Sequence, residues 1–169
     1  SLYSPHPHLH RGARRPSLKT SENLSDLIVA AAFPQPYIPC YLTTREFFQE
    51  TSGHLSNRGV VMINVGKTPG DSAVTDAIAA TMRDVFPSVY TFETGPFNQL
   101  VVATKKLTRA TDLTDRTGAM PPKVAQLARE VTPYLVDVQP GGAVLTDDKA
   151  PVEWRTDQMI VNYATQGQE

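Results

Sequence analysis

The side chains of this sequence best suited to chemistry are three carboxylates near its C-terminal end. Asp147, Asp148 and Glu153 lie within seven residues, in the segment LTDDKAPVEW. Carboxylates at this density can bind a polyamine or another cation, because a partly desolvated ammonium group needs acidic acceptors. A solvated acidic loop that leads into a helix cap has the same spacing. Spacing alone therefore leaves a cation-binding segment and a solvated loop as alternatives.

The other groups of reactive side chains are less specific. The turn GKTPG, residues 66–70, lacks the glycine and lysine order of a phosphate-binding loop, so it predicts a flexible connection from a strand to a helix. His6, His8 and His10 alternate without an acid or cysteine beside them, which favours a tail with incidental histidines over a metal site. The sequence contains no G-x-G-x-x-G turn and no G-x-S-x-G elbow. We therefore expect no metal site and retain no cofactor.

Size and composition predict one globular domain. The chain has 169 residues, of which 40% are hydrophobic and 20% charged, and its net charge is -1. This charge favours neither nucleic acid nor an anionic membrane as a partner. No apolar run approaches the roughly 18 residues that span a bilayer. Cys40 is the single cysteine, so no internal disulfide is expected, and the cytoplasm is the default location.

Apolar runs and turn residues predict alternating strands and helices from residue 25 onward. Residues 26–33, DLIVAAAF, and residues 60–65, VVMINV, have the composition of strands that are buried on both faces of a parallel sheet. Thr43, with Glu46 three residues later, predicts the start of a helix. Asp71 or Ser72 is suited to cap the next one. The inner stripe of that second helix would consist of Val74, Ala77, Ile78, Met82 and Val85.

The rest of the chain completes an α/β pattern. The segments SVYTFE and NQLVVATK are separated by only TGPF, which predicts an antiparallel hairpin. A helix should follow Pro121 with Val124, Leu127, Ala128 and Val131 on its inner side, and a last helix should include Met159 and Val161. This order predicts an open, mostly parallel sheet with helices on both faces and a C-terminal antiparallel hairpin. The proline-broken, basic residues 1–24 are expected to be a poorly ordered leader before a domain at 25–169.

Two segments resemble a known family. The segment DLIVAAAFPQPYIPCYLTTREFF is similar to a long motif of bacterial spermidine synthase-like proteins, the polyamine aminopropyltransferases, and LTDDKAPVEW is similar to their C-terminal motif. The segments GVVMINVG, AIAATMRDVFPSVYTF and NQLVVAT lie between them in the order that the family uses. The resemblance covers about Asp26 to Met159. It implies the C-terminal part of a methyltransferase-like Rossmann domain.

The resemblance also implies a reaction. The family transfers an aminopropyl group from decarboxylated S-adenosylmethionine, its co-substrate, to putrescine. An aspartate after the fourth strand is taken to deprotonate the attacking amine, which has no lone pair while it is an ammonium ion. On this basis Gln35, Tyr37, Asp147, Asp148 and Glu153 would line the diamine side of the site.

The sequence departs from the family pattern in two places. Ala31 occupies the position of the expected catalytic aspartate, and Pro34 that of an arginine. The family's N-terminal hairpin region, glycine-rich cofactor loop and ribose-binding acid do not precede Asp26. We therefore expect an impaired or inactive aminopropyltransferase with no catalytic residue retained. A polyamine is its expected ligand, and its partner would be a second copy or the missing N-terminal half, because the strands at Ile28 and Val61 lose a neighbour.

Two other functions remain alternatives. The first is a non-enzymatic binding or assembly module that pairs through an exposed sheet edge. The second is an S-adenosylmethionine-dependent methyltransferase of other specificity, which would need the glycine-rich loop that this sequence lacks.

Overall fold

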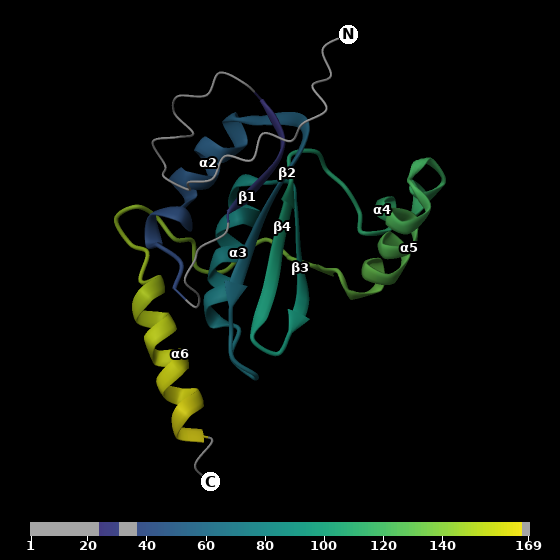
Figure 1. The fold of residues 1–169 in the computed structure, drawn as a ribbon. Coiled ribbons are helices and arrows are strands. Elements are labelled where there is room, and N and C mark those ends of the chain that lie inside the picture. The colour runs from purple at the N-terminus through teal and green to yellow at the C-terminus, as the bar shows by residue number, and fades with distance from the viewer. Residues whose placement is uncertain (1–23, 31–36, 167–169) are drawn as a thin grey trace.

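The computed structural model describes residues 24–30 and 37–166, and these residues form a mixed five-stranded sheet with helices (Figure 1). The strand order is β1-β2-β4-β3-β5. The strands are β1 (Ser25–Ala30), β2 (Leu55–Gly66), β3 (Ser88–Gly95), β4 (Asn98–Thr104) and β5 (Val136–Asp137). The predicted α/β fold is therefore confirmed. The predicted leader, apart from Leu24, lies outside the described residues.

The strand pairing confirms the antiparallel hairpin and corrects the expectation of a mostly parallel sheet. β1 pairs with β2 in parallel, whereas β4 pairs antiparallel with both β2 and β3, and β5 pairs antiparallel with β3. β2 and β3 run in the same direction, as a strand–helix–strand unit requires, but β4 lies between them. The chain reverses after β3, and β4 inserts antiparallel between β2 and β3, two strands that the sequence predicts to be parallel neighbours.

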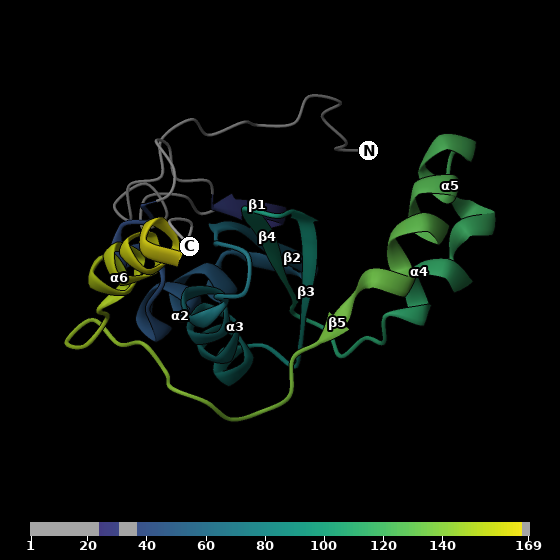
Figure 2. The same cartoon turned by 90° about the horizontal axis from the view of Figure 1, so that it is seen from below.

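The long helices lie on one face of the sheet, which corrects the prediction of helices on both faces. Figure 2 shows α2 (Arg45–Gly53), α3 (Ala73–Val85) and α6 (Val152–Gln166) on the same side of the strands. Both crossovers, β1 to β2 and β2 to β3, advance in one direction across the sheet. Right-handed crossovers that advance in one direction place their helices on one face.

Short side chains fix the starts of α2 and α3. The Thr44 hydroxyl accepts a hydrogen bond from the Phe47 backbone N–H at 3.2 Å, so α2 is capped one residue later than Thr43. Asp71 accepts from the Ala73 N–H at 3.0 Å at the start of α3. In α3, the predicted inner residues Val74, Ala77, Ile78 and Met82 are buried. Periodicity therefore located this helix and its inner stripe.

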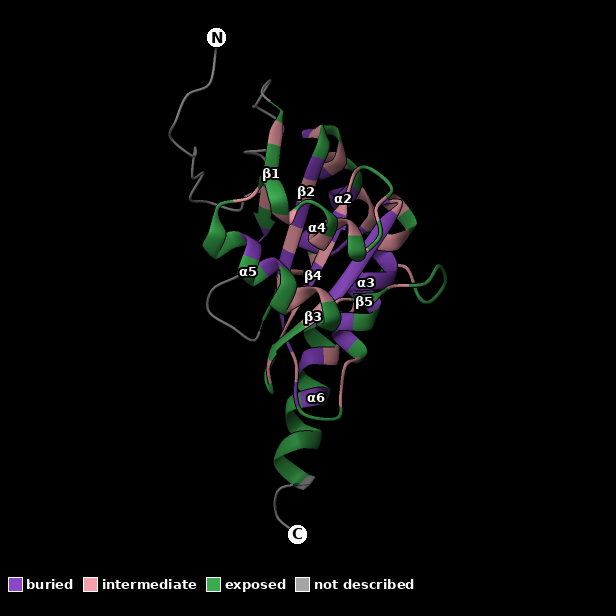
Figure 3. Cartoon of the chain, turned by 90° about the vertical axis from the view of Figure 1, so that its right-hand side faces the viewer, coloured by how far each residue is buried: buried purple, intermediate pink, exposed green. Residues whose placement is uncertain are grey.

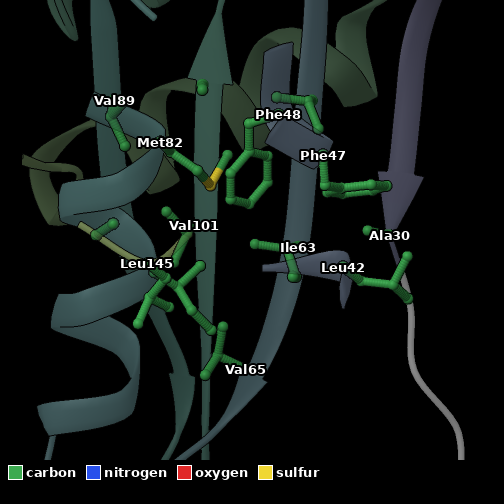
Figure 4. Close-up of a cluster of buried hydrophobic side chains, with 14 of the residues drawn as sticks. Ala30, Leu42, Phe47, Phe48, Ile63, Val65, Met82, Val89, Val101 and Leu145 are labelled. Atoms are coloured by element: carbon green, nitrogen blue, oxygen red, sulfur yellow. The ribbon is translucent and has the colours of Figure 1, made fainter. Parts of the chain in front are cut away.

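The core lies between the sheet and these helices. Figure 4 shows Phe48 from α2 and Met82 from α3 packed against Ile63 and Val101 of the central strands. Each of these side chains is at most 1% exposed. Leu145 joins the cluster from the segment that precedes α6. The C-terminal part of the chain is therefore anchored in the same core as the strands.

Residues 105–138 form an excursion beyond β3 with α4 (Thr111–Asp115) and α5 (Pro122–Val131), as Figure 2 shows. The inner stripe predicted for α5 is only partly correct. Ala128 is buried together with Ala125, whereas Val124 and Leu127 are 49% and 57% exposed. Among the described elements, α5 makes its larger contacts only with α4 and short 3-10 turns, and these leave Val124 and Leu127 outward. Three short 3-10 turns complete the structure: Cys40–Leu42, Thr117–Ala119 and Thr132–Tyr134.

Candidate functional site

The candidate site lies where the loop after β1 meets the segment before and within α6. In α/β sheets, ligands bind beyond the carboxyl ends of the parallel strands, and the loop after β1 leaves such an end. Residues 37–46, which comprise the end of this loop and the start of α2, run alongside residues 145–157, about one hundred or more positions later in the sequence. We call this interface the seam. It unites the two segments on which the family resemblance depends.

The Tyr37 phenol forms one end of the seam. Its hydroxyl donates a hydrogen bond to Asp157 Oδ1 at 2.8 Å, and the ring is 45% exposed. This hydrogen bond, followed by the negative charge of Asp157, raises the pKa of Tyr37 above the ordinary tyrosine value. The phenol is therefore held neutral with its proton directed at α6.

Glu153 forms the middle of the seam. Its carboxylate accepts a hydrogen bond from the Cys40 backbone N–H at 3.1 Å. Glu153 lies in the first turn of α6, where a negative charge is favourable beside the unpaired helix N–H groups. Burial raises the pKa of the Cys40 thiol, and the Glu153 carboxylate raises it further. The thiol is therefore kept protonated and weakly nucleophilic.

Asp147 forms the other end of the seam. Its Oδ1 accepts a hydrogen bond from the Thr44 hydroxyl at 2.7 Å, and its backbone N–H donates to Glu46 at 3.0 Å. The Arg45 N–H donates to the Leu145 carbonyl at 2.8 Å. Because Thr44 is the N-cap of α2, the Asp147 carboxylate binds the group that begins this helix. The acidic turn and α2 are thus tied together by both side chains and backbone.

The order of these contacts is antiparallel. Tyr37, Cys40 and Thr44 face Asp157, Glu153 and Asp147 respectively. The structure therefore brings three of the predicted substrate-binding residues, Tyr37, Asp147 and Glu153, to one interface. Asp147 and Asp148 are the two central residues of the turn between Thr146 and Lys149, and the Asp148 side chain is exposed. Ala31 and Gln35 lie outside the described residues. The substrate roles of all these residues stay predictions.

Sequence reasoning missed Asp157, which is the seam residue closest to the C-terminus. Asp157 follows Glu153 by four residues, so both carboxylates share one face of α6. That spacing is visible in the sequence and could have identified it. The partner of Asp157 is not visible there, because Tyr37 is 120 positions away.

Two of the seam carboxylates, Glu153 and Asp157, have acceptor capacity beyond the bonds described. A carboxylate offers about four lone-pair sites, and a single hydroxyl or N–H fills one of them. An ammonium group that approaches the seam can therefore add hydrogen bonds to oxygens already fixed in position. The arrangement suits the binding of an amine cation. Among residues 24–30 and 37–166, no group of His, Cys, Asp and Glu side chains has the geometry of a metal centre.

The second strand-to-helix loop is arranged differently. The GKTPG segment leads from β2 to α3 through a turn closed between Thr68 and Asp71, as expected for a connection of this kind. Lys67 pairs with Glu93 of β3 and is largely covered. Its cation is thus neutralised within the sheet rather than presented to an anion.

Comparisons with known proteins support both the fold and the resemblance. No protein-family model matches the chain. A probable spermidine synthase from Corynebacterium glutamicum has a similar structure, with a TM-score of 0.51 and 18% identity, over 76% of this chain and 52% of that chain. At this identity the likeness shows the fold. The chain therefore shares part of the α/β fold of that probable synthase.

The sequence comparisons find relatives in the family that the motifs resemble. A polyamine aminopropyltransferase from Vibrio vulnificus is 32% identical over 125 residues, which cover 72% of this chain and 38% of that protein. A probable polyamine aminopropyl transferase from Bifidobacterium longum is 27% identical over 87% of this chain and 38% of that protein. These matches confirm the resemblance to the polyamine aminopropyltransferase family. The matched region is only a part of each of these relatives. The chain spans about 38% of the length of each of these relatives.

No helix in the described part of the chain combines the length and the apolar character needed to cross a bilayer.

Proposed function

We propose that this chain provides the amine-acceptor side of a spermidine synthase-like aminopropyltransferase and that, as it stands, it is impaired or inactive in the reaction. The family reaction is aminopropyl transfer from decarboxylated S-adenosylmethionine to putrescine. The observation that carries the proposal is the seam, in which Tyr37, Asp147 and Glu153 of the two family-like segments lie at one interface. The resemblance of those segments to one family supports reading this interface as a binding site.

The charge of the seam suits a diamine. A protonated diamine carries an ammonium group at each end, and the end that does not react needs fixed acidic acceptors. Asp147 and Glu153 are such acceptors, and each is oriented by a hydrogen bond from the loop after β1. Gln35 and Asp148 complete the proposed set from the same two segments. The seam would thus bind and orient the acceptor rather than activate it.

The proposed impairment follows from the sequence. The attacking amine must lose a proton before it can act as a nucleophile, and a carboxylate would be a suitable base. Ala31 cannot accept that proton, and the sequence contains no G-x-G-x-x-G loop for the co-substrate. Two separate parts of the reaction are therefore affected.

An assay of aminopropyl transfer from decarboxylated S-adenosylmethionine to putrescine tests this proposal. We expect no turnover by this chain, with the Vibrio vulnificus relative as the active control. Ala31→Asp alone should not restore activity, because the co-substrate loop is still absent. Turnover at the rate of the control would refute the impairment.

Calorimetry with putrescine tests the binding role separately. We expect binding to this chain to be weakened in a Glu153→Gln variant, since the amide keeps the hydrogen-bond acceptor for Cys40 but loses the charge. Thr165→Ala, at the other end of α6, is the control. Equal affinity in all three proteins would remove Glu153 from the site.

A further inference from the structure

One face of the sheet is apolar, and among residues 24–30 and 37–166 no helix layer lies over it at β1 and β2. It is defined by six side chains from three strands, which we call the open face: Leu27, Val29, Val60, Met62, Leu100 and Val102. The residues that alternate with them, such as Val61 and Ile63, face the core. The open face therefore follows from the alternation of side chains along the strands, and its apolar residues form a group instead of being scattered singly.

The strand register makes the open face continuous. Leu27 pairs with Val60 and Val29 pairs with Met62 across β1 and β2. Met62 in turn pairs with Val102 of β4. Side chains in register on one face lie about 5 Å apart and touch. Adjacent rows thus join into one patch that crosses three strands.

Exposure is greatest at the β1 side of this patch. Leu27 and Val29 are 55% and 54% exposed, and Figure 3 shows exposed and intermediate segments alternating along most of β1. Tyr90, one strand beyond Val102, is covered instead and donates a hydrogen bond to the Thr108 carbonyl at 2.6 Å. The excursion after β4 therefore protects the β3 side, whereas no described element gives the β1 side a similar cover.

The outer edge of β1, beside the exposed part of the open face, is also without a partner among the described residues. Among the described residues β1 pairs with β2 alone, so its other edge presents unpaired backbone groups. Its sequence, Ser25–Ala30 SDLIVA, has the apolar run typical of a strand with neighbours on both sides and layers on both faces. Both the edge and the face of β1 are incomplete.

We propose that the open face and the outer edge of β1 bind a polypeptide equivalent to the portion of the polyamine aminopropyltransferases that this chain does not span. The chain covers 38% of the length of the curated relatives and 52% of the solved synthase. The unspanned portion is thus long enough to supply both strands and helices. It adds a strand beside β1 and covers Leu27 and Val29 with helices.

The handedness of strand connections explains why one polypeptide would fill both places. Crossovers that advance from β1 toward β3 place their helices on the core face. Parallel strands added beyond β1 advance in the opposite direction, so their right-handed crossovers place helices on the open face. β1 then becomes the point where the strand order reverses, which is where α/β sheets bind ligands. The loop that carries Tyr37 leaves from this point, so the docked polypeptide would also complete the candidate site.

A second copy of this chain fits less well. Pairing of two β1 edges about a two-fold axis extends the sheet but leaves both open faces uncovered. Packing of two open faces against each other leaves both β1 edges unpaired. The unspanned portion satisfies the edge and the face together.

The test is co-expression of this full chain with the unspanned portion of the Vibrio vulnificus relative. We expect a one-to-one complex by light scattering, in which the amides of Ser25–Ala30 exchange hydrogen more slowly than in this chain alone. Leu27→Glu and Val29→Glu should weaken the complex by about tenfold or more, the loss expected for a central apolar contact. Leu127→Glu is the matched control, because Leu127 on α5 is 57% exposed and far from β1.

Each other outcome counts against the proposal. Absence of a complex would overturn it, as would equal weakening by Leu127→Glu. A homodimer of this chain alone that Leu27→Glu dissociates would assign the surface to a second copy. Because the measurements report association and not turnover, they can succeed when the proposed aminopropyl transfer fails, and the reverse.

Discussion

The two faces of the sheet are built from the same strands with similar side chains, yet the described helices form a complete covering layer on only one of them. On the core face, Val61, Ile63 and Val101 are at most 1% exposed beneath α2 and α3. On the open face, the neighbouring Leu27 and Val29 are more than half exposed. Apolar composition alone therefore does not decide burial. The direction in which the crossovers advance decides it, because that direction selects the face on which helices fall.

The contrast between the faces can be tested by truncating one side chain on each. Phe48→Ala should lower the free energy of unfolding by about 3–5 kcal/mol, because a fully buried ring leaves a cavity. Leu27→Ala should change it by less than about 0.5 kcal/mol, because the side chain is already in water. Urea denaturation of both variants measures the difference. Equal losses would mean that the open face is covered in solution.

A second prediction concerns the hydrogen bond that holds the C-terminal segment against the core face. The Leu145 N–H donates to the buried Thr81 hydroxyl at 2.9 Å, and that hydroxyl donates to the Ala77 carbonyl at 2.7 Å. Thr81→Val keeps the shape of the side chain but leaves the Leu145 N–H without this acceptor. We expect a loss of about 1–3 kcal/mol, the cost of a buried group without its hydrogen bond.

Thr51→Val is the control for Thr81→Val. Thr51 is also fully buried, and its hydroxyl donates to the Phe47 carbonyl at 2.8 Å, one turn earlier in the same helix. Within the described part of the chain, the Thr51 hydroxyl makes no other hydrogen bond. The loss in Thr51→Val should therefore be the smaller one in thermal denaturation. A loss equal to that of Thr81→Val would show that the contact with Leu145 contributes little.

A third, smaller effect is expected where the seam meets α2. Thr44→Ala removes both the helix cap and the hydroxyl that binds Asp147, and the cap alone is worth about 1 kcal/mol. Thr44→Ser should retain stability, since it keeps the hydroxyl. A double-mutant cycle of Thr44→Ala with Asp147→Ala isolates the contact across the seam. A coupling energy of zero would show that the acidic turn does not depend on Thr44.

Much of the core face could be predicted from the sequence. The buried residues of α3 recur with helical periodicity, and the β3–β4 hairpin follows from a link of four residues, because both signals are local. The placement of β4 between β2 and β3 could not be predicted in this way, since it depends on pairing between residues 32 to 44 positions apart. The outward face of α5 was missed because periodicity shows that Val124 and Leu127 share a side but not whether anything packs there.

The candidate site was also predictable only in part from the sequence. The family-like motifs identified Tyr37, Asp147 and Glu153, but not that each contacts the opposite segment. Such contacts join residues more than one hundred positions apart, and no local signal encodes them. Asp157 was missed for that reason, although its helical spacing from Glu153 was visible.

The smallest predicted effect tests whether the end of the seam persists in solution. Asp157 raises the pKa of Tyr37, so the folded state binds the phenol proton more tightly than the unfolded state. This contribution to stability is fully present below the ordinary tyrosine pKa of about 10 and is lost as pH rises through the higher folded value. Asp157→Asn should move the Tyr37 titration down toward the ordinary value.

Ultraviolet absorbance titration measures this shift, with Tyr37→Phe subtracted to isolate one of the six tyrosines. Glu153→Gln is the matched control on the same face of α6, because Glu153 bonds to Cys40 rather than to Tyr37. A Tyr37 titration that is unchanged in Asp157→Asn would mean that the phenol and α6 are apart in solution. The seam would then begin at the Cys40–Glu153 contact, and Tyr37 would not be fixed in the loop after β1.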